Sequence, residues 1–568
     1  MPCNFNTASE EYADFITRYY TSPEEFMQMA GTECIDFINY QFAVVHIPLS
    51  SARELSLSTY TYTAIPELYS LLDFTSMDAA GILQTAETPP LSNNGRGVLI
   101  GFIDTGIDYQ NPLFQNAGGT TRILGIWDQT TGTGNIVPEN TFRSTYGTQY
   151  TKSQIDEALA AEDPLSIVPA TDENGHGTAL ASIAAGAIDE VNGFTGAAPE
   201  CYIGVVKLKP AKQYLRDFFL IEENTPAYQE NDIMMGITYL FALARQYNTP
   251  LVICIGLGTN SGSHTGHSTL GLFLNEMSSY NGTAFVIAAG NETGYDHHYR
   301  GTTTPGSHVH NVELNVGEET RGFSMELWAQ DIGVYSVGFL SPSGQTVQIP
   351  SVRTERSETF RFLLENTQIT VYSRITATES ASQLIFLRFQ DPQPGIWTLV
   401  ITSLIDIPGT FHLWLPLRSF IPDSIGFLRP DPDTIITGPG NAQYPITVGA
   451  YDHTKDSIYI HSSRGFSRSG QIKPELAAPG VNILAASLRP GSYTRITGTS
   501  AAAAHVAGAA AVLLSWGILE RNDPYMNSSS IKTYLIRGAS RNPNRTYPNR
   551  EFGYGTLNLY QAFLRLRL

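Results

Sequence analysis

The chain has 568 residues, of which 42% are hydrophobic and 15% are charged, and its formal net charge is −19. This length exceeds one typical domain and predicts about three folding units with large apolar cores. Such a negative charge disfavours nucleic acids and anionic membranes as partners, because both attract cationic protein surfaces.

The amino-terminal residues and the cysteines indicate the compartment in which the chain is made. The start of the sequence has no basic region followed by an apolar run, so we expect no Sec signal. No stretch is apolar over the length that crosses a bilayer, and we expect no membrane span. Four cysteines in a chain of this length predict free thiols, no disulfide and cytoplasmic synthesis, although export by another route stays open.

Residues 1–74 are predicted to form a small α+β unit. Residues 8–20 begin with acidic side chains and continue with apolar residues three and four apart, which predicts a helix. A second helix is predicted to begin at Pro23, because proline suits the first helical turn. Residues 34–47 and 57–65 are rich in apolar, aromatic and β-branched side chains and predict strands.

Strands and helices alternate from residue 75 to residue 302. The predicted strands are continuous apolar runs at residues 96–103, 202–208, 251–255 and 284–288. The predicted helices lie at residues 176–186 and 232–245. Apolar strands separated by helices are typical of an α/β fold with a parallel sheet that is covered by helices on both faces. The same pattern resumes at residue 433 and continues to residue 568, so this α/β unit is interrupted.

The interruption, residues 303–432, has a different pattern. Short stretches of alternating polar and apolar residues are separated by Gly, Pro and Ser. This pattern predicts an inserted antiparallel β-sandwich. We interpret its Trp and Tyr residues as core side chains, with a face that binds carbohydrate or a protein partner as the alternative.

Four motifs lie at predicted strand ends and helix starts of the α/β unit. Asp104 follows an apolar strand in Ile-Asp-Thr-Gly, at the sheet edge where catalytic groups of open α/β sheets gather. His176 stands between two glycines at the start of a small-residue helix, which leaves the imidazole accessible. Ser500, in Gly-Thr-Ser, opens another such helix, where backbone N–H groups favour developing negative charge. Asn291 ends Ala-Ala-Gly-Asn after a strand, where its amide can donate to an oxyanion.

Each motif taken alone also has a structural interpretation. Aspartate and asparagine are common in turns, and serine is a favoured helix N-cap. A serine hydroxyl needs an adjacent base to act as a nucleophile, and the base needs an acid that fixes its tautomer. The four motifs together supply all of these groups, in the order Asp, His, Ser in which one class of such triads occurs. Their joint occurrence favours catalysis over capping.

At these motifs the chain resembles the subtilisin-like serine peptidases of family S8. The similarity covers residues 75–300 and 435–568 and includes Lys-Pro-Glu-Leu-Ala-Ala-Pro-Gly at residues 473–480. It implies a parallel sheet between two layers of helices, a protein substrate and a triad mechanism. The residues to which it assigns roles are Asp104, His176 and Ser500 as the triad, and Asn291 with the Ser500 N–H as the oxyanion hole.

The same resemblance implies how substrate and ions are bound. The residues expected to pair with substrate backbone are Ile255, Gly256, Leu257 and Gly258, and side-chain pockets would then select the peptide. Ala504 replaces the proline that usually follows the serine motif, which changes the helix start but removes no catalytic group. Leu113 stands where many relatives have a calcium-binding aspartate, and the loop at 188–193 also differs, so we expect no metal. We also expect no cofactor.

Over nearly its whole length the chain resembles the Csp germination proteases of spore-forming clostridia in organisation. The stretches that carry this similarity are residues 207–212, 215–219, 232–237 and 290–292, with His297 and His298. It implies a prodomain at residues 1–74, a catalytic domain at 75–302 and 433–568, and a jelly-roll domain at 303–432. It also implies that Ser500 cuts the prodomain tail, in a region that comprises Leu72, Asp73, Phe74 and Thr75.

We therefore predict a serine endopeptidase that cleaves its own prodomain and keeps it bound in the cleft. The similarity implies a spore-associated enzyme that activates the zymogen of a cortex-lytic hydrolase during germination. Two alternatives stay open, because fold alone does not determine function. One is a general subtilisin-like peptidase, and the other is a non-catalytic pseudoprotease that binds or senses on the same fold.

Overall fold

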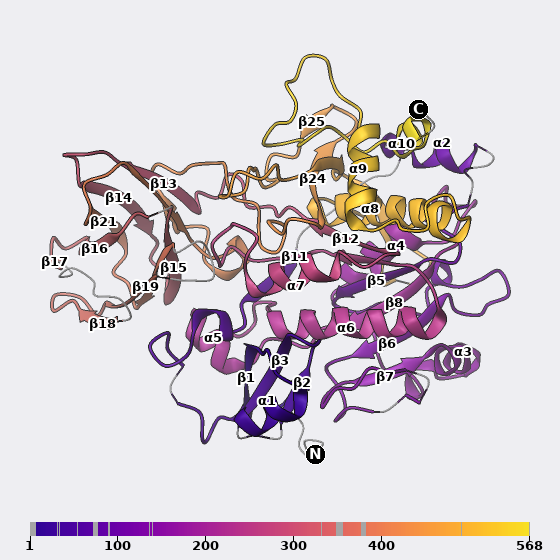
Figure 1. Ribbon diagram of the computed structural model, residues 1–568, viewed down its shortest axis with the longest axis horizontal. Coiled ribbons are helices and arrows are strands. Elements are labelled where there is room, and N and C mark those ends of the chain that lie inside the picture. The colour runs from indigo at the N-terminus through magenta and orange to yellow at the C-terminus, as the bar shows by residue number, and fades with distance from the viewer. Residues whose placement is uncertain are drawn as a thin grey trace.

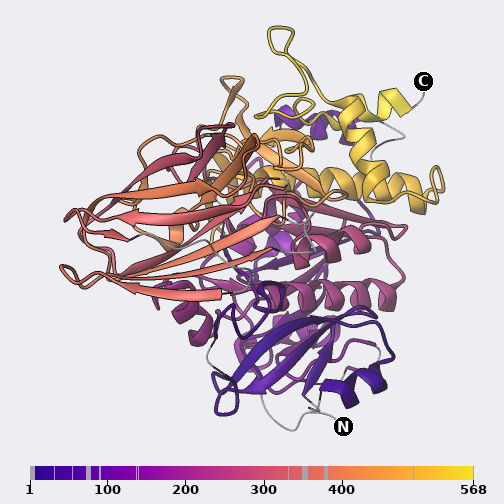
Figure 2. The ribbon, with the colours of Figure 1, turned by 60° about the vertical axis from the view of Figure 1, so that its left-hand side comes forward.

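The computed structural model describes residues 7–566 except 31, 33, 54, 72–77, 89, 90, 92, 136, 139, 331, 348–355, 376–381 and 490. A central sheet lies between helices, with a small amino-terminal unit below it and a two-sheet unit to the left in Figure 1. Figure 2, turned by 60°, shows the same three parts in contact from a second side.

The central sheet has nine strands in the described part of the chain. Its order is β25-β24-β12-β10-β5-β8-β6-β7, and β26 pairs with β24. The inner pairs are parallel, and the two outermost pairs, β6 with β7 and β24 with β25, are antiparallel. The strands are β5 (Leu99–Asp104), β6 (Ile123–Asp128), β7 (Thr148–Thr151), β8 (Tyr202–Lys207), β10 (Leu251–Ile255), β12 (Thr283–Ala288), β24 (Ile446–Asp452), β25 (Ser457–Ile458) and β26 (Leu476–Pro479).

Helices cover both faces of this sheet, which confirms the predicted α/β fold. One face packs against α4 (His176–Ala185) and α8 (Thr499–Leu514), and the other against α6 (Glu230–Tyr247) and α7 (Thr269–Met277). Every residue of α8 is buried, and its alanines and glycine allow close packing on the strands. The remaining helices are α2 (Ile82–Ala86), α3 (Lys152–Ala160), α5 (Gln213–Phe219), α9 (Ser528–Gly538) and α10 (Leu559–Leu566).

One helical stretch in the described residues, Thr499–Leu519, is long and apolar enough to cross a membrane by composition alone. Within the fold, 83% of its most apolar window is buried. We therefore interpret it as the core helix of the central sheet, since a buried core helix meets the same length and hydropathy criteria.

Three predictions that concern the amino-terminal unit are wrong. Residues 8–20 contain the strand β1 (Tyr12–Arg18), not a helix. The first five residues of β1 are all buried, so the sequence does not show the polar–apolar alternation by which a strand is recognised. Residues 57–65, predicted as a strand, form turns and a short 3-10 helix. Cys34 is disulfide-bonded, whereas Cys201 and Cys254 are free as predicted. The number of cysteines alone could not show that one of them lies close enough to another to form a disulfide. The other elements are α1 (Pro23–Ala30), β2 (Ile35–Phe37) and β3 (Phe42–Pro48), in the sheet order β1-β3-β2.

The inserted unit consists of two antiparallel sheets whose inner faces form one apolar core. Trp397 is fully buried in that core, and Trp328 and Trp414 are buried beside it, which confirms the interpretation of these aromatics as core side chains. A jelly-roll topology stays a prediction. The strands are β13 (His298–Thr303), β14 (Val309–Val316), β15 (Gly322–Ala329), β16 (Tyr335–Leu340), β17 (Thr346–Val347), β18 (Arg356–Arg361), β19 (Gln368–Ile375), β20 (Gln383–Gln390), β21 (Gly395–Ser403), β22 (Gly409–Trp414) and β23 (Gly426–Phe427).

Candidate active site

Two of the predicted residues meet at the carboxyl edge of the central sheet. Asp104 is the last residue of β5 and His176 is the first residue of α4. The His176 Nδ1 lies 2.6 Å from the Asp104 Oδ1, and both side chains are buried. The Thr105 N–H donates to the same carboxylate oxygen at 2.8 Å, which holds the carboxylate in place. A carboxylate in this position can fix the tautomer of the imidazole and stabilise an imidazolium.

The glycines of the two motifs allow their backbones to touch. A Cβ on Gly177 would clash with the carbonyl oxygen of Gly106, so no larger residue fits at position 177. The Gly177 N–H donates to the Thr105 Oγ1 at 3.0 Å and joins the segment after β5 to the first turn of α4. The Asp-Thr-Gly and His-Gly-Thr motifs therefore form one rigid corner.

Ser500 reaches the same corner from the start of α8. Its hydroxyl donates to the carbonyl oxygen of Gly256 at 3.4 Å. The Ser500 Cβ and the His176 Cε1 each lie 3.2 Å from the point where a Cβ would stand on Gly256. The serine and imidazole side chains thus face the same small space, which only a glycine at position 256 leaves open.

Asn291 lies beside the serine and is fixed by the residue that precedes it. The Asn291 Oδ1 accepts from the Thr499 N–H and from the Thr499 hydroxyl, each at 3.1 Å. The Thr499 Oγ1 in turn accepts from the Gly290 N–H at 3.1 Å. With its oxygen bound in this way, the Asn291 side chain has its NH2 group left to donate, and that group hydrogen-bonds to no other described residue.

The predicted substrate edge is occupied by the chain's own amino-terminal segment. Strand β11 (Leu257–Gly258) pairs antiparallel with β4 (Leu68–Leu71), and the other edge of β4 pairs with β9 (Tyr228–Gln229). Of the four residues predicted for this edge, Leu257 and Gly258 form these pairs. Ile255 instead ends β10 in the central sheet, and Gly256 lies at the serine. The predicted processing residues, Leu72, Asp73, Phe74 and Thr75, lie outside the described residues.

The sequence analysis did not identify Asp172, which accepts hydrogen bonds from both segments of this corner. Its Oδ1 accepts from the Thr105 hydroxyl at 2.8 Å and from the Asn174 and Gly175 N–H groups. Its Oδ2 accepts from the N–H and the hydroxyl of Thr178, at 2.9 and 2.7 Å. This carboxylate therefore caps α4 and connects it to the Asp104 segment. The Asp-x-x-Gly pattern before the helix was the signal that could have identified it.

The negative charge of the corner affects neighbouring groups. Burial raises the pKa of Tyr228, and the carboxylates of Asp104 and Asp172 raise it further. Burial also raises the pKa of the Cys254 thiol, with a smaller contribution from Asp104. Tyr228 and Cys254 thus stay neutral beside the Asp104 carboxylate, and buried surroundings of this kind strengthen the attraction between a carboxylate and a protonated imidazole.

The segment where relatives place calcium is held by an arginine. The Arg122 guanidinium is buried and donates to the carbonyl oxygens of Leu113, Ala185 and Cys201, at 2.6, 2.5 and 2.8 Å. Burial lowers the pKa of this arginine. Within the described ranges, no group of three or more His, Cys, Asp or Glu residues could hold a metal ion.

Comparison with known proteins agrees with this geometry. The family model of the subtilases, peptidase family S8, matches residues 95–378 and 430–555. The solved structure of the Clostridium perfringens CspB protease has a TM-score of 0.75 and 31% identity, over 86% of this chain and 97% of that chain. Serine protease AprX of Bacillus subtilis strain 168 is 34% identical over 131 residues, which is 20% of this chain and 28% of AprX. The chain therefore belongs to the subtilase family and is a subtilisin-like serine endopeptidase.

Proposed function

We propose that Asp104, His176 and Ser500 form the catalytic triad of this peptidase. The observation that carries the proposal is the 2.6 Å contact between the His176 Nδ1 and the Asp104 Oδ1, next to the serine. In this mechanism the imidazole takes the proton of the Ser500 hydroxyl as its oxygen attacks the peptide carbonyl, and then gives it to the leaving amine. The Asn291 NH2 and the Ser500 N–H stabilise the oxyanion.

We propose further that the first substrate of Ser500 is the chain's own amino-terminal segment, which acts as a prodomain. Its strand β4 occupies the β11 edge in an antiparallel register, with Ser70 opposite Gly258 and Leu71 opposite Leu257. Leu257, the partner of Leu71, directly follows Gly256, whose carbonyl oxygen accepts from the Ser500 hydroxyl. This supports a processed bond in the predicted region from Leu72 to Thr75. The amino-terminal product then stays bound through its buried contacts.

The intact mass of the purified full chain tests both parts of this proposal. The wild-type protein is expected to contain two fragments that co-purify, whereas Ser500→Ala is expected to remain one uncut chain. Ser279→Ala, a change of an exposed serine in another part of the chain, serves as the matched control and should be cut normally. Amino-terminal sequencing of the larger fragment then identifies the bond. A wild-type protein that stays uncut contradicts self-cleavage.

Labelling with a fluorophosphonate separates catalysis from a pseudoprotease role. After removal of the bound amino-terminal fragment, the processed protein is expected to be labelled once, and Ser500→Ala not at all, because only an activated serine reacts with the probe. If the wild-type protein is not labelled even after removal of the amino-terminal fragment, the non-catalytic alternative is the correct one.

We propose a role in spore germination as the physiological function, in which the enzyme activates a cortex-lytic hydrolase by cutting its propeptide. The support is the 31% identity to the Clostridium perfringens CspB protease over 86% of this chain. We propose a spore-associated location for the same reason. The purified enzyme should convert a purified hydrolase zymogen to one shortened product, and Ser500→Ala should not. Detection of the enzyme in culture medium, and not in spores, would favour a general peptidase.

A further inference from the structure

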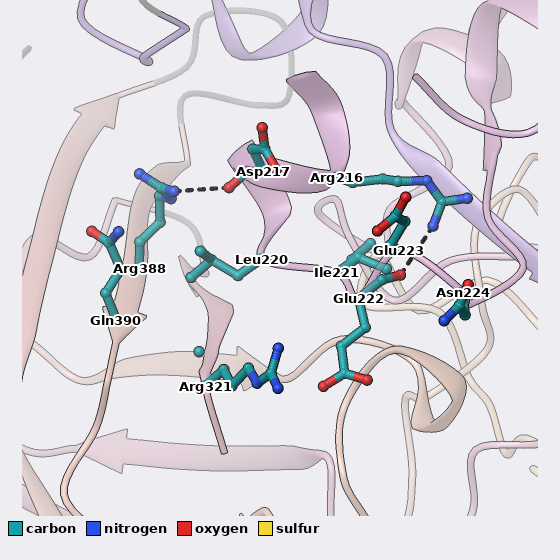
Figure 3. Close-up of a pocket in the computed structure, with 11 residues that line it drawn as sticks. Arg216, Asp217, Leu220, Ile221, Glu222, Glu223, Asn224, Arg321, Arg388 and Gln390 are labelled. Atoms are coloured by element: carbon teal, nitrogen blue, oxygen red, sulfur yellow. Dashed lines mark hydrogen bonds between the residues drawn. The ribbon is translucent and has the colours of Figure 1, made fainter. Parts of the chain in front are cut away.

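A cavity of about 690 Å³ lies at the seam between the catalytic unit and the inserted unit, away from Ser500. Its first wall is the end of α5 with the loop that follows, residues 220–224. Its second wall is the start of β15 with the facing part of β20, where Gly322 pairs with Gln390. Figure 3 shows side chains from both walls pointing into the same space. Cavities of this size are typical of small-molecule sites.

Arg216 fixes the loop of the first wall, residues 220–224, through hydrogen bonds to backbone carbonyl groups. Its guanidinium is buried and donates to the carbonyl oxygens of Ala211, Glu222 and Thr225, at 2.9, 3.1 and 2.8 Å. Leu220 and Ile221 form an apolar surface between the charged groups (Figure 3). The cavity is therefore a feature of fixed backbone and does not depend on a mobile loop.

The second wall is attached to the first by direct contacts. The Arg388 Nη2 donates to the carbonyl oxygen of Asp217 at 3.0 Å, and its guanidinium lies 5.6 Å from the ring centre of Phe218. A Cβ on Gly322 would stand 3.1 Å from the Leu220 Cδ1, so the two units pack closely beside the cavity. The distance between the walls is thus set by packing.

Opposite charges without protein partners face this cavity from the two walls. The guanidinium of Arg321, on the inserted unit, makes no hydrogen bond or ion pair with another described residue. The carboxylate of Glu222, on the catalytic unit, likewise has no such partner among the described residues. In Figure 3 both side chains extend into the lower part of the cavity. Glu223 also lines the cavity, but its carboxylate lies on the side of Arg216 and acts on that guanidinium. Arg321 and Glu222 are therefore the cation and the anion of the lower part of the cavity.

We propose that this cavity binds a small zwitterion, with the ligand carboxylate on Arg321 and the ligand ammonium on Glu222. A guanidinium binds carboxylates with two parallel hydrogen bonds, and charge-assisted bonds are the stronger class. An apolar side chain of the ligand packs on Leu220 and Ile221. Both free amino acids and short peptides carry this pair of charges, and the cavity has room for either.

Such a ligand contacts both units at once. Because it binds the joined arrangement and not the separated one, it stabilises the seam in proportion to its concentration. The proposal is independent of the proposed catalytic function, since no group of the cavity lies at Ser500. It can therefore be tested on protein that does not cut peptides.

Isothermal titration of the full chain that carries Ser500→Ala tests the proposal. The probes are L-leucine as a free amino acid and glycyl-L-leucine as a peptide. N-acetyl-L-leucine lacks the ammonium and L-leucinamide lacks the carboxylate, so both are expected not to bind. Arg321→Gln and Glu222→Gln should each weaken binding about tenfold or more, as expected for loss of a charge-assisted contact. Glu162→Gln, an exposed carboxylate on another surface, should leave binding unchanged.

A charge exchange distinguishes direct contact from damage to the fold. The double variant Arg321→Glu and Glu222→Arg keeps both charges and should restore binding, with the ligand reversed. Preference for leucine or for glycyl-leucine shows whether the site takes free amino acids or peptides. Two results overturn the proposal: no saturable binding of either probe at concentrations on the order of 10 mM, or binding that is unchanged in both single variants.

Discussion

At the scale of single residues, the reactive groups depend on a carboxylate that does not itself face the substrate side. Asp172 accepts five hydrogen bonds from two segments, one that carries Asp104 and one that carries His176. An acceptor with two oxygens can satisfy these donors only as a carboxylate. We interpret Asp172 as a positioning residue, since it acts through Thr105 and Thr178.

Asp172→Asn is expected to lower kcat by about 10- to 100-fold with little change in KM, because the amide NH2 meets donors where the carboxylate oxygen accepted. The rate of fluorophosphonate labelling should fall in parallel. Asp108→Asn removes a neighbouring carboxyl that, among the described residues, accepts only from the Gln110 N–H, and it should retain nearly wild-type activity. Equal activity of the two variants contradicts a positioning role.

At the scale of elements, a buried guanidinium joins three segments that are far apart in sequence. Arg122, just before β6, binds the segment after β5, the carboxyl end of α4 and the residue before β8. The Leu113 carbonyl also accepts from the Ala187 N–H at 2.8 Å, whereas the Ala185 and Cys201 carbonyls would lose a hydrogen bond in a buried region, which costs free energy. The arginine thus provides the positive charge that a bound cation could provide in such a loop.

Arg122→Met is therefore expected to destabilise the protein by about 3 kcal/mol, with one part from each lost hydrogen bond. Thermal unfolding measures this change. Arg96→Met is the matched control, because its guanidinium is exposed and its one ion pair within the described ranges is with Glu200, and such surface pairs contribute about 1 kcal/mol or less. A chelator should leave the wild-type melting temperature unchanged. A clear drop with EDTA would show that a metal, and not Arg122, stabilises this region.

At the scale of the whole molecule, a buried ion network holds the amino-terminal unit on the catalytic unit. The His46 imidazole lies between the carboxylates of Asp14 and Asp36, at 2.8 and 3.2 Å. The Lys212 ammonium, from the catalytic unit, lies 2.9 Å from the Asp14 carboxylate. Burial alone would lower the pKa of His46, but hydrogen bonds to Asp14 and Asp36 raise it to about 9.

This network predicts that the amino-terminal unit binds less tightly in alkali. Because the pKa of His46 is raised from 6.5 to about 9, its contribution is complete below pH 6.5 and is lost as the pH rises through 9. The loss is roughly 3 kcal/mol. Thermal unfolding at pH 6.5 and pH 9.5 should show it in the wild-type protein and in His267→Asn, an exposed control.

His46→Gln should be less stable at pH 6.5 but should change less between the two pH values. The comparison between the two proteins cancels the contributions of other titrating groups. Among these is Lys212, whose pKa is lowered by burial. Identical pH dependence of His46→Gln and the wild-type protein would contradict the role of the imidazole.

The sequence predicted features that depend on neighbouring residues, but not contacts between residues that are far apart in the chain. The order of strands and helices and the motifs at Asp104, His176 and Ser500 were readable, because strand ends and helix starts carry local signals. Arg122 was not identified, because its partners are carbonyl groups of distant segments. Strand β1 was wrongly predicted as a helix. Both of its faces are buried, so its sequence lacks the alternation of polar and apolar residues that marks a half-exposed strand.

The placement of β4 also has a consequence for the substrates that we propose bind at the same edge. Leu68 and Tyr69 use one edge of the strand to pair with β9, and Ser70 and Leu71 use the other edge to pair with β11. A polypeptide that takes the same place must offer unengaged N–H and C=O groups on both edges in succession. Residues already bonded within a helix or sheet cannot do so until they open locally. If substrates bind where β4 lies, as we propose, we expect the enzyme to select by backbone freedom first and to cut the hinges and linkers of a folded protein before its core.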